Sequence, residues 1–123
     1  MAIKRIAVEF GIGTDLRGTD YTKAACRALR DALWHNSLTI YRALGYAPED
    51  MLVEVVIGVT EPEKVDHDAL KKILPYGTAT ITVNKGGLDI PHQDGSDNTI
   101  VANAAAIVSL NFDEVNKESG NVA

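Results

Sequence analysis

Apolar and polar side chains alternate along three stretches of the chain, and a period of two predicts β-strands. The first stretch covers residues 3–10; Phe10 lies on its expected buried face, and two glycines are expected to end it. The second, residues 52–59, is apolar on both faces except at Glu54, which is typical of a strand covered on both sides. The third covers residues 79–83.

Two other stretches have the period of an amphipathic helix. Asp20 is a favourable N-cap residue, and alanines and leucines form an apolar stripe along the helix expected at residues 20–34. Residues 35–37 are expected to interrupt it. A shorter helix is expected at residues 66–74, where a turn at residues 75–77 ends it.

The C-terminal third is more ambiguous. Its alanines favour helix, but the alternation within residues 100–112 predicts a fourth strand, preceded by a polar loop at residues 88–98. The expected element order is therefore β-α-β-α-β-β. This order indicates an α/β (α+β) fold with one four-stranded mixed sheet and two helices on one face. It forms a single domain over residues 1–112, followed by a flexible tail at residues 113–123.

Two helices can cover only one face of such a sheet. The second face is expected to carry Leu52 and Val56, together with Ala102, Ala104 and Ala106. Another copy of the same chain is the simplest cover for an apolar sheet face. We therefore expect a homo-oligomer.

The composition narrows the possible partners. The chain has 123 residues, a formal net charge of −5 and 46% apolar residues, which is typical of one globular domain. The acidic balance argues against nucleic acid, no apolar run is long enough for a membrane span, and the first residues lack a signal-peptide pattern. Cys26, the single cysteine, cannot form an internal disulfide, so the expected location is cytoplasmic. All five arginines lie in the first third, which allows a local basic site.

Residues 11–20 are the one stretch with chemical character. Three glycines, two carboxylates and an arginine join a strand to a helix N-terminus, a place that suits anions. A dinucleotide fingerprint would need glycine in place of Leu16, and a P-loop would need lysine in place of Thr19. We therefore expect no nicotinamide, no nucleoside triphosphate and no other cofactor. Gly13 is expected to have a positive φ or to lie against a ligand or a partner chain.

Two interpretations of this segment remain open. In the first, Arg17, Lys23 or Arg27 holds an anionic or carbonyl-bearing ligand, and Asp15 orients a side chain or accepts a proton. In the second, the segment is a glycine-rich turn capped by Asp20, with a structural role only.

The segment resembles the signature Gly-x-Gly-x-Asp-x-His-Gly of a family of uncharacterised conserved hypothetical proteins from bacteria and plants. Gly11, Gly13, Asp15 and Gly18 match it, whereas Arg17 stands where the family usually has histidine. Because arginine stays protonated, we expect no acid–base role at this position. The resemblance extends over most of the chain and implies no activity. Further matching positions are Gly86, Gly87 and Asn103.

At the level of fold, the chain resembles AroH-class chorismate mutases, the Rid (YjgF) proteins and the repeats of cyanuric acid hydrolases. This resemblance implies a chorismate-mutase-like fold, threefold assembly and ligands at subunit interfaces. The first two groups use late arginines, and no arginine follows Arg42 here. Cyclic-amide hydrolases use a lysine-activated serine, a role that Lys85 could fill with Ser96 or Ser109.

The leading hypothesis is a small anionic or cyclic carbonyl compound bound at a subunit interface of a trimer or a multiple of three. If there is turnover, a cofactor-independent hydrolase or isomerase is expected, with Asp15 and Lys85 as catalytic candidates. The alternative is a non-enzymatic assembly protein in which the same segment forms the subunit contact. His92 has acidic neighbours, but their spacing matches no known metal site, so no metal is expected. The ligand-binding candidates are Gly11, Gly13, Thr14, Arg17, Gly18, Asp20, Lys23, Arg27, Gly86, Gly87 and Asn103.

Overall fold

The computed structural model describes residues 2–34, 39–74 and 78–112. The helix break expected at 35–37, the turn expected at 75–77 and the tail expected at 113–123 lie outside the described residues. The elements are β1 (Ile3–Asp15), α1 (Tyr21–Leu33), α2 (Ile40–Ala43), η2 (Pro48–Asp50), β2 (Leu52–Val59), η3 (Pro62–Lys64), α3 (His67–Lys71), β3 (Thr78–Lys85), β4 (Leu88–Pro91) and β5 (Asn98–Asn111).

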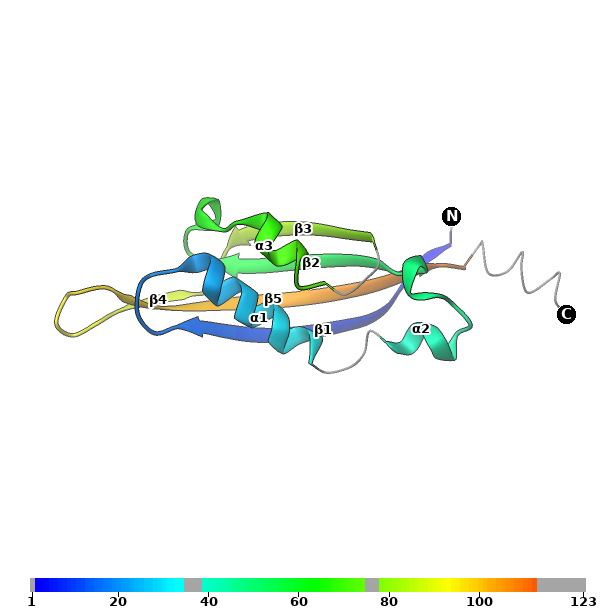
Figure 1. Ribbon diagram of the computed structural model, residues 1–123, viewed down its shortest axis with the longest axis horizontal. Coiled ribbons are helices and arrows are strands. Elements are labelled where there is room, and N and C mark those ends of the chain that lie inside the picture. Colours follow the sequence, from blue (N-terminus) through cyan, green and yellow to red (C-terminus); the bar gives the residue numbers. More distant parts are fainter. Residues whose placement is uncertain (1, 35–38, 75–77, 113–123) are drawn as a thin grey trace, which may run out of the picture.

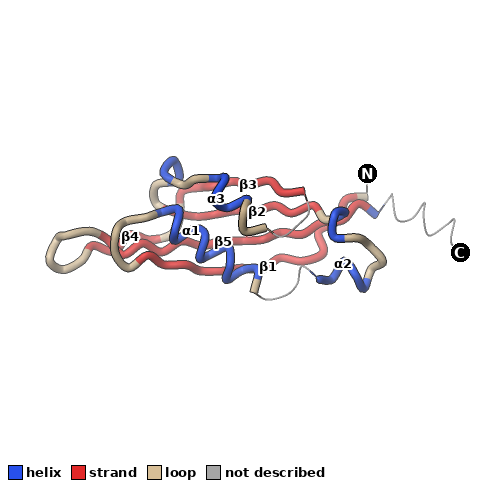
Figure 2. The backbone as a smooth tube through the Cα atoms, viewed as in Figure 1, coloured by secondary structure: helices blue, strands red, loops and turns tan. Residues whose placement is uncertain are grey.

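These strands form one mixed sheet, and the helices lie along one face of it (Figure 1). The order is β1-β5-β2-β3, with β4 paired to the beginning of β5. The long strand β5 is antiparallel to β1, β2 and β4, whereas β2 and β3 are parallel. Figure 2 shows the strands running together behind the helices. The α+β class with a single mixed sheet is confirmed.

The sheet has five strands, so the expectation of four is wrong. Residues 88–98, expected as a polar loop, contain β4 and a turn that leads into β5. Leu88 and Ile90 alternate with Asp89, but the proline and the acidic residues that follow hide this short pattern. The strand is stabilised because β5 extends beyond the end of β2 and offers it a pairing edge.

The first strand is also longer than expected, because Gly11 and Gly13 lie inside it rather than at its end. A Cβ atom on Gly11 would lie 2.2 Å from the carbonyl oxygen of Ala28, and one on Gly13 would lie 2.2 Å from the amide nitrogen of the same residue. Glycine therefore lets α1 pack directly on the strand. Gly13 does not have the positive φ that was one of its expected alternatives. In the turn that follows, Gly18 has a φ of 98° and Thr19 a φ of 51°.

Two expectations about which side chains face the helices are wrong. Ala102, Ala104 and Ala106 were expected on the uncovered face, but they are buried on the helix side. Phe10 was expected to be buried, but it is 69% exposed on the opposite face. A register shift near Ile6 explains the second error, because one extra residue in a strand moves all later side chains to the other face.

The helix side holds the core. Asp20 caps α1 as expected, its side chain accepting a hydrogen bond from the Lys23 amide at 3.0 Å. The helix packs on β1 and β5, and α3 packs beside it. From β2, the side chains of Val53, Val55, Ile57 and Val59 point into this core.

The opposite face, which we call the open face, has no helix over it in the described part of the chain (Figure 1). Strand register places side chains of β1, β4 and β5 together on it. Its large exposed apolar side chains are Phe10 (69% exposed), Leu88 (60%), Ile12 (56%) and Ile90 (52%).

Candidate functional site

The turn at residues 16–20 is held by hydrogen bonds within the chain. Asp15 is 2% exposed, and its Oδ2 accepts a hydrogen bond from the Asp20 amide at 2.9 Å. The ammonium of Lys23 lies 3.8 Å from the other oxygen of Asp15. From the β4–β5 connection, Asp97 Oδ2 accepts a hydrogen bond from the Gly18 amide at 2.8 Å. These contacts give Asp15 a structural role in shaping the turn.

Two side chains of α1 occupy the outer edge of β1. The guanidinium of Arg27 donates to the carbonyl of Thr14 at 2.7 Å, and Asp31 Oδ2 accepts from the amide of Ile12 at 2.9 Å. Since β1 is an edge strand, the backbone carbonyl of Thr14 and the backbone amide of Ile12 would otherwise be free to pair with another strand. Arg27 and Asp31 therefore block strand addition at this edge.

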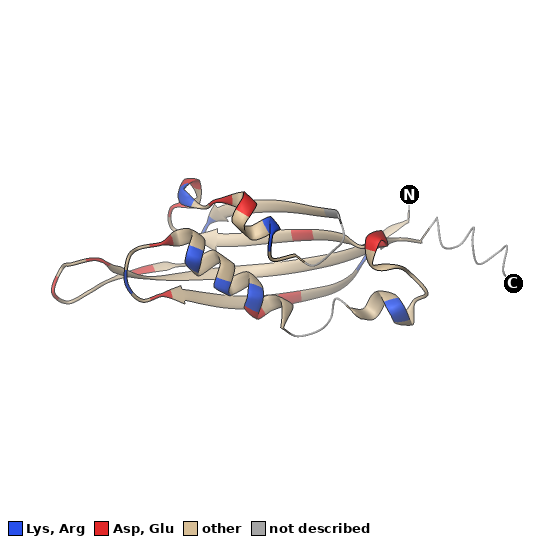
Figure 3. Cartoon of the chain, viewed as in Figure 1, with Lys and Arg blue, Asp and Glu red and all other residues tan. Residues whose placement is uncertain are grey.

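The other two cations of the expected ligand site, Arg17 and Lys23, are both exposed. Arg17 is exposed in the turn and has no ion pair within the described ranges. Lys23 is half exposed on the outer side of α1, where basic residues follow one another along the helix (Figure 3). Hydrogen bonds within the chain thus occupy Asp15, Asp20 and the Gly18 amide of this segment.

The expected ligand-binding residues are divided between the two faces of the sheet. Gly11 and Gly13 lie beneath α1, whereas Asn103 pairs with Gly58 and faces the open side. Gly86 also lies on this side, because a Cβ on Gly58 would face the open side and would lie 3.5 Å from the Cα of Gly86. The Gly86–Gly87 pair lets the chain cross the end of β2 on its way from β3 to β4.

The catalytic candidates are also far apart. Asp15 lies on β1 and Lys85 on β3, at the two edges of the sheet, so two strands separate them. Ser109 pairs with Leu52 at the opposite end of β2 from Lys85, which corresponds to roughly 20 Å along the strand. The hydroxyl of Ser96 donates to Asp94 at 2.7 Å. No hydrogen bond joins Lys85 to either serine among the described residues.

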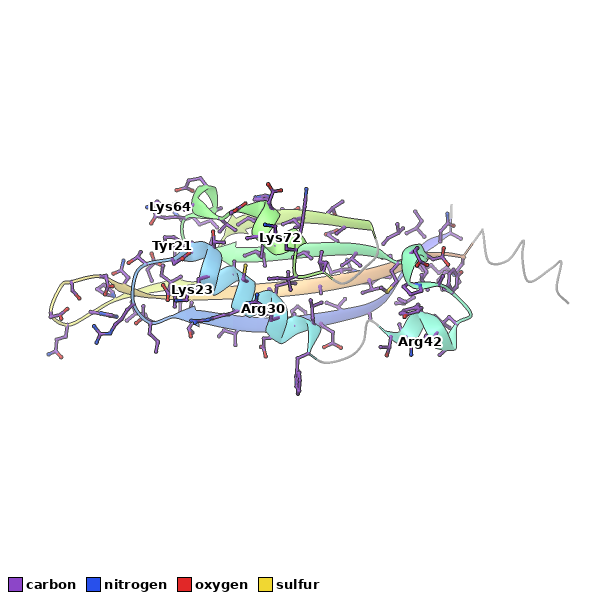
Figure 4. All side chains as sticks on the ribbon, viewed as in Figure 1. Tyr21, Lys23, Arg30, Arg42, Lys64 and Lys72 are labelled. Carbon is purple, nitrogen blue, oxygen red and sulfur yellow. The ribbon has the colours of Figure 1, made fainter. Side chains whose placement is uncertain are left out.

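A polar cluster that the sequence did not predict lies at the N-terminus of α1. The hydroxyl oxygen of Tyr21 is 2.6 Å from Glu61 Oε2 and 2.5 Å from Asp89 Oδ2, and it accepts a hydrogen bond from Thr60 at 3.3 Å. Lys64 pairs with Glu61 at 3.1 Å and lies over the Tyr21 ring (Figure 4). The cluster joins α1, the end of β2 and β4.

The environment of this cluster makes Tyr21 a hydrogen-bond donor. Burial, with the hydrogen bonds to Asp89 and Glu61, raises the pKa of Tyr21 above its usual value, so the phenol keeps its proton at neutral pH. The hydrogen bond from Tyr21 and the contact with Lys64 lower the pKa of Glu61. No sequence signal could have linked Tyr21 with Asp89, because the link depends on β4.

His92, whose acidic neighbours in the sequence were considered as metal ligands, pairs with Asp97. Its Nδ1 is 2.7 Å from Asp97 Oδ1, and its Nε2 is 3.0 Å from the hydroxyl of Thr99. Among the described residues, no group of three histidine, cysteine or acidic side chains is arranged to hold a metal ion.

The open face carries a hollow of about 260 Å³ beside the exposed ring of Phe10. Gly58 of β2 lies between Asn84 of β3 and Asn103 of β5 in one row across the sheet, and Val56 lies in the next row. The two asparagines and Val56 border this hollow, and the backbone of Gly86 and Gly87 packs over Gly58.

Comparison with known proteins identifies one similar crystal structure and a matching protein family. In the described ranges, no helix is long and apolar enough to cross a membrane. No curated protein matches the chain. A crystal structure of an FtsZ-like protein of unknown function from Nostoc punctiforme is similar, with 35% identity and a TM-score of 0.81; the match covers 90% of this chain and 98% of that one. Over residues 5–108 the chain matches the conserved hypothetical proteins of Lin0512_fam, and it therefore belongs to that family.

Proposed function

We propose that the chain is an assembly module that packs its open face against another copy of itself. The observation that carries the proposal is the group of four large apolar side chains on this face, each more than half exposed. Contiguous apolar surface of this kind marks interaction sites in soluble proteins. A second copy is the favoured occupant because the same face on both partners is self-complementary in apolar character.

The edge of β1 supports packing through the face rather than pairing through the edge. Arg27 and Asp31 already occupy the outward backbone groups of Thr14 and Ile12. An added strand would have to displace both side chains. Face-to-face contact needs no such displacement. Because the same face is used by both copies, this contact by itself gives a dimer, and a trimer or a multiple of three, the form expected from the sequence, would need a second, different contact.

Sedimentation velocity tests this proposal at micromolar concentration. We expect an oligomer for the natural chain and a monomer for Phe10→Lys, because a charge would be buried in the contact. Trp34→Lys is the matched control: Trp34 is 78% exposed, but it lies on the helix side. A monomeric natural chain, or dissociation by both substitutions alike, would contradict the proposal.

A second candidate function is small-molecule binding in the hollow beside Phe10. The observation that favours it is the row of Asn84, Gly58 and Asn103, which places two carboxamides beside an apolar floor. A partner copy would enclose this hollow and give the interface ligand site expected from the sequence. A cyclic amide such as cyanuric acid is the probe; it should raise the unfolding temperature of the natural chain and not that of Asn103→Leu.

A further inference from the structure

The helix side carries a separate groove between α1 and α3. It has a volume of about 730 Å³, within the range of small-molecule sites. Both helices contribute to it near their C-terminal ends, and they pack side by side (Figure 1). Its apolar lining consists of Cys26, Leu33, Trp34, Ala69 and Ile73.

Two cations flank this apolar lining. Arg30 comes from α1 and Lys72 from the end of α3, and both are exposed (Figure 4). Neither forms an ion pair within the part of the chain that the structure describes, and no carboxylate lines the groove. In a chain of net charge −5, two cations without acidic partners at one groove are a local departure from the overall balance.

Helix energetics explain the cations only in part. Basic residues at the C-terminal end of a helix interact favourably with its dipole; Arg30 lies in the last turn of α1, and Lys72 is the C-cap residue of α3. That effect requires no apolar hollow beside them. Trp34, at the end of α1, nevertheless leaves most of its indole exposed at the rim.

Cys26 contributes surface rather than reactivity. Burial raises the pKa of its thiol, while Arg30 acts in the opposite direction. Asp20 and Asp66 add to the rise from outside the lining. A protonated thiol is an apolar contact for a ligand.

We propose that this groove binds a small amphipathic anion, a carboxylate carried on an apolar body. Arg30 and Lys72 hold the carboxylate, and Leu33, Ile73 and the Trp34 indole cover the apolar body. The site lies on the opposite side of the sheet from the proposed assembly face, so the two functions are independent.

Sodium octanoate is the probe, and the fluorescence of Trp34 is the readout because it is the single tryptophan. We expect saturable binding, with acetate and octanol each at least about tenfold weaker, because one lacks the apolar body and the other the charge. Octanol binding as tightly as octanoate, or no saturable change with octanoate, would overturn the proposal.

Charge variants locate the site. Arg30→Gln and Lys72→Gln should each weaken octanoate binding about five- to tenfold, in line with the loss of one charge-assisted contact. Lys71→Gln is the matched control, since Lys71 is exposed on the same helix but does not line the groove. Equal effects of Lys71→Gln and Lys72→Gln would show nonspecific charge attraction and refute the site. Phe10→Lys should leave octanoate binding unchanged, which separates this test from the assembly test.

Discussion

The two faces of the sheet use the same strands in opposite ways. Toward the helix, β1 and β5 present glycine and alanine, and the backbone of α1 approaches closely enough that a Cβ at Gly13 would meet it at 2.2 Å. Toward the open side, β1 presents Phe10 and Ile12, both more than half exposed. Where α1 crosses β1 and the alanines of β5, the buried side therefore has the smaller side chains, so side-chain size does not identify the buried face of the strands there.

The difference also separates stability from interaction. On the helix side, close contact between backbones leaves no room for an added atom, so changes there act on folding. On the open face, large side chains have few neighbours within the chain, so changes there act on what the face can bind.

The largest expected effect comes from Gly13→Ala compared with Phe10→Ala. The added methyl group would meet the α1 backbone, which cannot move as a flexible side chain can, so we expect a loss of at least about 3 kcal/mol in the free energy of unfolding. Phe10→Ala, measured under dilute monomeric conditions, should change it by only about 0.5 kcal/mol. Urea denaturation measures both. Similar losses for the two variants would remove the distinction between the faces.

A smaller effect is expected where α1 meets β4. Tyr21→Phe deletes the hydroxyl that contacts Glu61 and Asp89, and Asp89 Oδ1 already has no partner in the described part of the chain. Leaving a partly buried carboxylate without its donor should cost about 1–3 kcal/mol. Ser96→Ala, a change in the exposed β4–β5 connection, is the control in the same denaturation experiment. An unchanged midpoint for Tyr21→Phe would mean that the cluster does not hold β4.

The smallest effect is a pH dependence from the same tyrosine. Because its pKa is raised in the folded chain, its contribution is fully present below the unfolded value of about 10 and is lost as pH rises above it. Near pH 10.5 the loss should stay below about 1 kcal/mol and should be missing in Tyr21→Phe. Parallel stability curves for the two proteins between pH 9 and 11 would contradict the assigned environment of Tyr21.

Local sequence determined much of the fold because the relevant signals lie within a few residues of one another. The alternation in residues 52–59 and 100–112 predicts strands that the structure confirms, and Asp20 marks the beginning of α1. Capping and alternation are short-range, so the sequence shows them directly.

Tertiary structure alone decided the arrangement of the candidate sites. Asp89 reaches Tyr21 only because β4 pairs with β5, and Asn103 is separated from Gly13 by the thickness of the sheet. Gly13 shows most clearly what the sequence cannot determine. The sequence shows that this position has no Cβ, but not whether a turn, a ligand or a helix requires its absence. The packing of α1 answers that question, because contact between distant segments is a property of the folded chain and not of the local sequence.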